Sequence, residues 1–108
     1  MAIHQELSNG GWQRLSLAEQ LGNIGSEISR AMKWQNKDKN IFNNTIDRAL
    51  ELFDLTLDDP RWIGRHQEIA RAREIFCDII FGDNQYKTSF SDLLRYFNNF
   101  AFVAMNKV

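Results

Sequence analysis

Apolar residues recur at helical spacing in four successive segments of this 108-residue chain, and this periodicity constrains the fold more than any other feature. In the first segment, for example, they fall three or four residues apart at Leu17, Leu21, Ile24, Ile28 and Ala31. Such spacing places the side chains on one face of an α-helix. Sustained alternation of apolar and polar residues, typical of half-buried strands, does not occur in the sequence. The pattern therefore predicts an all-α protein.

A capping signal and a polar break delimit the first two helices. Ser16 followed by Glu19 matches the capping box that begins many helices. We expect the first helix over residues 16–35. The polar stretch 36–40 interrupts the apolar repeat, which resumes over residues 42–57 as a second helix.

Proline, glycine and serine mark the boundaries of two further helices. Pro60 suits the first position of a helix, because the N–H that it lacks would have no partner there. We expect a third helix from Pro60 to about Phe81, ended by Gly82 in the left-handed conformation. Ser89 and Asp92 can cap a fourth helix that runs to the C-terminal residues.

Four helices with short connections favour an antiparallel up-down four-helix bundle. The composition, 44% hydrophobic and 25% charged, is that of an ordinary globular domain with one core. We assign residues 15–108 to this single domain and residues 1–14 to a flexible N-terminal segment. On the first helix, Ala18, Gly22, Gly25 and Ser29 form a ridge of small residues. We expect this ridge to let a neighbouring helix approach closely rather than to line a ligand channel.

The charge balance and the single cysteine limit the partners and the compartment. Thirteen basic and fourteen acidic residues leave a net charge of −1, so nucleic acid is an alternative partner rather than the favoured one. Cys77 cannot form an internal disulfide, which fits the reducing cytoplasm. The sequence lacks a run of about 18 apolar residues, so we expect no membrane-spanning helix.

Four carboxylates share one stripe of the second helix. Asp47, Glu51, Asp54 and Asp58 lie three or four residues apart. Arg73 falls on the side of the third helix that should be buried, where an unpaired charge would be costly. We therefore expect a buried ion-pair network of Asp47, Glu51, Asp54 and Arg73. The chain has only two histidines and no Glu-x-x-His motif of di-iron bundles, so the sequence predicts no metal site and no cofactor.

One short string bears on catalysis. The segment Arg61-Trp62-Ile63-Gly64-Arg65-His66 has the form arginine, four residues, histidine, and in a small helical protein it resembles the signature of the HEPN domain family. That family consists of compact, commonly dimeric helical bundles, among them metal-independent ribonucleases and inactive nucleotide-binding or partner-binding members. The resemblance implies that Arg61 binds the scissile phosphate and that His66 transfers protons. The alternative, which we prefer, is that Arg61 and Arg65 are solvated and that His66 lies at the boundary of the core.

The length and helix pattern also resemble the four-helix proteins encoded in ribosomal-RNA intervening sequences. Relatives of those proteins accompany reverse transcriptases in diversity-generating retroelements. This resemblance concerns the fold alone, and it implies an accessory RNA-binding role as a further alternative.

The last two helices carry more apolar residues than one bundle can bury. Phe102 and Val103 point away from the core stripe of the last helix, and a second stripe on the third helix comprises Ile63, Ala70, Cys77 and Phe81. Surplus apolar faces typically mark association. We predict a homo-oligomer, with a dimer favoured, whose interface includes Phe102, Val103, Ile63 and Phe81. The preferred function is a non-catalytic, self-associating interaction or accessory module, and the alternative is a HEPN-like nucleotide-binding or RNA-binding domain or ribonuclease.

Overall fold

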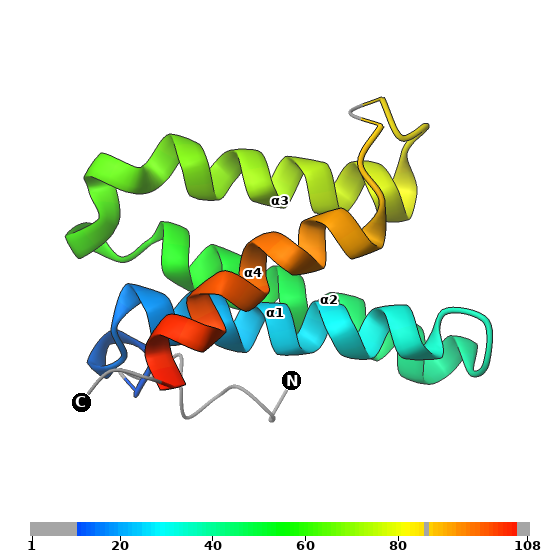
Figure 1. Cartoon of the computed structure of the whole chain (residues 1–108), viewed down its shortest axis with the longest axis horizontal. Coiled ribbons are helices and arrows are strands. Elements are labelled where there is room, and N and C mark those ends of the chain that lie inside the picture. The colour runs from blue at the N-terminus through cyan, green and yellow to red at the C-terminus, as the bar shows by residue number, and fades with distance from the viewer. Residues whose placement is uncertain (1–10, 86, 106–108) are drawn as a thin grey trace.

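The computed structural model describes residues 11–85 and 87–105, and at positions 101 and 103–105 it describes the backbone alone. All regular structure in these ranges is helical. This confirms the predicted all-α class, with four α-helices in that part of the chain (Figure 1). The elements are η3 (Trp12–Arg14), α1 (Leu17–Trp34), α2 (Lys39–Leu57), η4 (Pro60–Arg65), α3 (His66–Phe81) and α4 (Phe90–Met105), where η denotes a 3-10 helix.

Helix α1 is at the centre of the packing. It contacts α2 and α4 extensively, whereas α3 contacts α2 and α4 more sparsely. In Figure 1, α4 runs obliquely across the molecule from the end where α3 finishes. An aromatic cluster joins three of the helices, because the ring centroid of Phe53 lies 5.9 Å from that of Phe76 and 5.7 Å from that of Phe97. All three rings are fully buried beside Ile24 and Ile28 of α1.

Side-chain caps fix where three of the helices begin. The capping box of α1 is confirmed: Glu19 N donates to Ser16 Oγ at 3.1 Å, and Ser16 N donates to Glu19 Oε1 at 2.8 Å. Ser89 Oγ accepts from Asp92 N at 3.0 Å ahead of α4, as predicted. Asp38 caps α2 in the same way, a role that the sequence analysis did not assign to it.

The close approach predicted for the small-residue ridge is confirmed at Gly25. A Cβ atom at this position would lie 2.7 Å from Phe97 Cβ, closer than two carbon atoms can pack. Helix α4 therefore lies against the backbone of α1 at this point, and its aromatic side chain enters the core directly.

The third helix differs from the prediction at both ends. Residues 60–65 form the 3-10 helix η4 with a kink at Trp62 (φ −106°, ψ 20°), so α3 begins only at His66. Gly82 follows α3 with φ −105°, so the predicted left-handed conformation is wrong. Crowding explains this glycine instead, because a Cβ there would lie 3.0 Å from Asp78 Oδ1 and 3.2 Å from Asp78 O.

The predicted flexible segment 1–14 is wrong for its last residues. Trp12 is fully buried and belongs to η3, so the folded domain includes this turn. Residues 1–10 lie outside the described part of the chain. Within that part, none of the helices combines the length and the apolar character that crossing a bilayer requires.

Candidate functional site

A buried carboxylate links the end of α2 to η4. The side chain of Asp59 is 1% exposed and caps η4 by accepting from Arg61 N at 3.1 Å. Its Oδ2 also accepts from Arg61 Nη2 at 2.7 Å and from Gln20 Nε2 at 3.2 Å. Chiefly because of the hydrogen bond from Arg61, the pKa of Asp59 is lowered to about 2. Asp59 is therefore a charged group held inside the domain by its partners.

Gln20 of α1 extends this arrangement into a network that closes the end of the bundle formed by η3 and η4. Its fully buried amide donates to Trp12 O at 2.9 Å and accepts from Trp62 Nε1 at 2.9 Å. Trp12 Nε1 in turn donates to the buried hydroxyl of Thr56 at 2.9 Å. With Asp59, these contacts join η3, α1, α2 and η4, and each buried polar side chain named here has a partner.

The structure assigns Arg61 a place in this network rather than beside His66. Arg61 Nη2 donates to Leu15 O at 2.8 Å, and its guanidinium carbon lies 4.3 Å from the ring centroid of Trp62. Its remaining contacts are those with Asp59, which raise the pKa of Arg61. His66 is exposed at the start of α3 and lines a separate polar hollow. Arg61 is therefore partly solvated, as expected, but also anchors the network. His66 faces solvent rather than lying at the boundary of the core.

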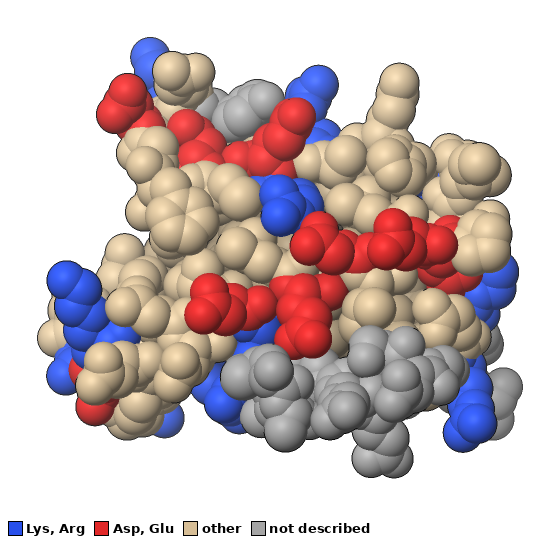
Figure 2. All heavy atoms as spheres, turned by 180° about the vertical axis from the view of Figure 1, so that it is seen from behind, with Lys and Arg blue, Asp and Glu red and all other residues tan. Residues whose placement is uncertain are grey.

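The predicted buried ion-pair network is wrong. Arg73 Nε contacts Asp54 Oδ1 at 3.1 Å, but the two side chains are 34% and 59% exposed. Asp47 is exposed and Glu51 is half-buried. Because α3 packs sparsely on α2, the acidic stripe lies at the edge of their contact and is solvated (Figure 2). The Arg73–Asp54 contact is a surface ion pair.

The residues predicted to form an oligomer interface lie on different elements. Ile63 of η4 is 81% exposed, Phe81 at the end of α3 is 68% exposed, and Phe102 of α4 is 68% exposed. The side chain of Val103 lies outside the described residues. Ile63 precedes α3 and Phe81 ends it, and the 16 residues of α3 span about 24 Å, so these residues do not form one compact patch.

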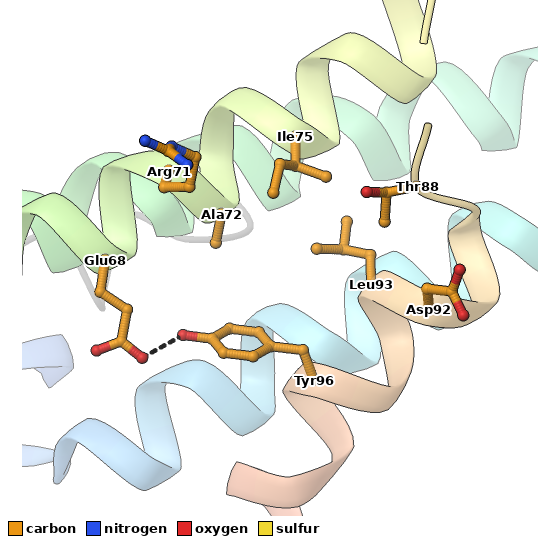
Figure 3. A pocket seen from close by; sticks show the side chains of 8 residues that line it. All are labelled: Glu68, Arg71, Ala72, Ile75, Thr88, Asp92, Leu93 and Tyr96. Carbon is orange, nitrogen blue, oxygen red and sulfur yellow. Dashed lines mark hydrogen bonds between the residues drawn. The ribbon is translucent and has the colours of Figure 1, made fainter. Parts of the chain in front are cut away.

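An apolar groove of about 250 Å³ separates α3 from α4 (Figure 3). Ala72, Ile75 and Leu93 point into it, and Tyr96 closes one end by donating from its hydroxyl to Glu68 Oε2 at 2.7 Å. Burial and this hydrogen bond raise the pKa of Tyr96, so its hydroxyl stays protonated at neutral pH. Arg65 donates to the other oxygen of Glu68 at 2.7 Å and holds the carboxylate in place. The sequence alone does not reveal this groove, because it depends on how α3 and α4 pack against each other, and the periodicity of neither helix encodes that packing.

The described residues contain no group of three or more His, Cys, Asp or Glu side chains placed to hold a metal ion. Comparisons with known protein families, with curated proteins and with solved structures found no significant match. The function must therefore be inferred from the residues of this chain.

Proposed function

We propose that the chain is a non-catalytic cytoplasmic protein, an antiparallel up-down helical bundle that dimerises and serves as an interaction or accessory module. The observation that carries this proposal is a seam along the outward face of α3, which Ile63 of η4 extends. Its members on α3 are spaced alternately three and four residues apart: Gln67, Ala70, Glu74, Cys77 and Phe81. This spacing is the one by which two helices form a coiled-coil contact.

The side chains of this seam suit contact with a second helix. Ile63 and Phe81, at its two ends, are large and exposed. Between them, Ala70 and Cys77 are small and half-buried, whereas Gln67 and Glu74 are polar and exposed. The small residues would let two backbones approach. An antiparallel pair of α3 helices that places Gln67 opposite Cys77 of the second copy would bring Ile63 of η4 towards Phe81 of the second copy at each end. Such a pairing is two-fold symmetric, as in most homodimers.

The charge of the chain favours a second copy as the occupant of this face. The net charge of −1 gives little electrostatic repulsion between two copies. The reducing cytoplasm is consistent with the thiol of Cys77, whose pKa is raised by burial and which is therefore protonated at neutral pH.

A designed disulfide tests both the dimer and its register. In the antiparallel pairing, residue 67 lies opposite Cys77 of the second copy. Within one chain these positions are about 15 Å apart, beyond the reach of a disulfide. We expect Gln67→Cys to form a covalent dimer under mild oxidation, detected by non-reducing electrophoresis and intact mass.

The control variant combines Gln67→Cys with Cys77→Ser, which should not cross-link, because the two copies of position 67 lie far apart in this register. Light scattering of the unmodified protein should give the mass of two chains. The mass of one chain at high micromolar concentration, together with no cross-link in Gln67→Cys, would overturn the proposal.

A further inference from the structure

The opposite end of the bundle carries an open hollow lined by basic residues. It lies between the C-terminal part of α1 and the N-terminal part of α2 and encloses about 410 Å³. Arg30, Lys33 and Trp34 line it from α1, and Asn44 and Arg48 line it from α2. In the rear view of Figure 2, Lys and Arg side chains gather at the left, where the α1–α2 turn lies.

The cations of this hollow are unpaired, unlike most of those elsewhere. On η4, α3 and α4, five arginines form ion pairs with neighbouring carboxylates: Arg61, Arg65, Arg71, Arg73 and Arg95. In the described part of the chain, Arg30, Lys33 and Arg48 form no ion pair. Arg48 Nε is shielded from solvent and has no hydrogen-bond partner. A solvent-shielded atom cannot itself meet a ligand in an open hollow, so Arg48 can contribute there only through the rest of its guanidinium.

The residue types around the hollow fit a phosphate joined to an aromatic base. Arginine and lysine are the side chains that bind phosphate oxygens most strongly. Trp34 is half-buried, with Lys33 Nζ 5.5 Å from its ring centroid, so an indole lies next to the cations. An indole can stack on any base. Lys37 and Lys39, both exposed in or beside the turn, continue the positive charge beyond the hollow.

We propose that this hollow binds a nucleotide phosphate, with Arg30, Lys33 and Arg48 holding the phosphate and Trp34 contacting the base. The nucleotide is either free or part of a single strand, since both present the same chemistry. This site is independent of the α3 seam, which lies on a different helix.

A nearby carboxylate provides the competing explanation. Glu27 Oε1 is likewise shielded and without a partner. Because α1 and α2 are joined by a short turn, Glu27 and Arg48 lie at similar levels along the two helices. If Arg48 serves only to neutralise Glu27, then the unmodified protein should not bind the anion, and binding should appear only in Glu27→Gln. If the hollow binds phosphate, the unmodified protein should bind it and Glu27→Gln should bind it more tightly.

Binding can be measured by fluorescence anisotropy of a labelled single-stranded oligothymidylate, with AMP and inorganic phosphate as competitors. We expect Lys33→Gln and Arg48→Gln each to weaken binding about tenfold, as the loss of a charged hydrogen bond would. Each should also reduce the slope of log affinity against log salt by about 0.7. Because Lys33 is exposed, Lys33→Gln tests the site even if Arg48→Gln fails to fold. Arg95→Gln makes the same charge change at a paired arginine and should alter affinity less than twofold.

The competitors identify the source of the nucleotide. AMP that binds as tightly as the strand supports a free nucleotide as ligand, and a strand that binds much more tightly than AMP supports a strand. Displacement by inorganic phosphate as effective as that by AMP would show that Trp34 contacts no base and would overturn the assignment. The proposal also fails if neither AMP nor the strand binds at low salt, if Arg95→Gln weakens binding as much as Lys33→Gln, or if Glu27→Gln does not strengthen it.

Discussion

Arginine and tryptophan occur at both ends of the bundle, but within the described residues their side chains have hydrogen-bond partners at only one of them. At the η3 and η4 end, Arg61 and Trp62 donate to Asp59, Leu15 and Gln20, and these contacts close that end. At the α1–α2 turn, Arg48 and Trp34 line an open hollow, and Arg48 Nε has no acceptor. Residue type alone therefore does not decide whether an arginine or a tryptophan closes one end of the bundle or lines an open hollow. The partners of each side chain do.

The two ends should differ most in the free energy of unfolding that is lost when Trp12 or Trp34 is replaced by alanine. Trp12→Ala deletes a fully buried indole and leaves Thr56 without its partner, so we expect a loss of about 3–5 kcal/mol in the free energy of unfolding. Trp34→Ala removes a half-buried ring at the open end and should cost less than about 1 kcal/mol. Urea denaturation followed by far-UV circular dichroism measures both. Equal losses of unfolding free energy in the two variants would contradict the difference between a closed end and an open end.

A smaller effect should follow from pH at the closed end. Since the pKa of Asp59 is lowered from 3.8 to about 2, its charged form stabilises the fold by up to about 2 kcal/mol above pH 4. That contribution should be lost as the pH falls from 4 to 2, because the unfolded state then binds the proton first. Asp59→Asn should remove this part of the acid dependence. The same pH dependence in Asp59→Asn and the unmodified protein would assign it to other carboxylates.

The smallest expected effect is at His66. Because His66 is exposed, His66→Ala should change the free energy of unfolding by no more than about 0.5 kcal/mol. With Arg61 held by Asp59, we also expect no cleavage of structured RNA by either protein. RNA cleavage that His66→Ala abolishes would show that Arg61 leaves its network to act with His66, as the HEPN resemblance implies. Arg61 and His66 would then form a catalytic site for RNA cleavage at this end of the bundle.

Local signals in the sequence predicted the helices well, because caps and apolar faces depend on residues within one or two turns. Ser16 with Glu19 and Ser89 with Asp92 are such signals, and both caps are observed. Gly25 likewise indicated a close approach to another helix, although not that Phe97 would be its neighbour.

The polar network could not be predicted in this way. Nothing in the sequence around Gln20 sets it apart from other residues of its helix, because its partners Asp59 and Trp62 are 39 and 42 positions away. Trp12 lies in a short 3-10 turn, which has no apolar period to reveal it. The Arg73–Asp54 pair was anticipated, but its exposure depends on how closely α3 packs on α2, and that distance is not encoded in the periodicity of either helix.

The contact between Gly25 and Phe97 has a consequence for local unfolding. Helices α1 and α4 cannot separate without breaking it, whereas α3 is held by fewer contacts. Amide hydrogen exchange should therefore be slowest in α1 and α4 and faster in α3. Pairing of two α3 helices would slow exchange in the most weakly held part of the molecule, so protection of α3 that rises with protein concentration would report assembly residue by residue.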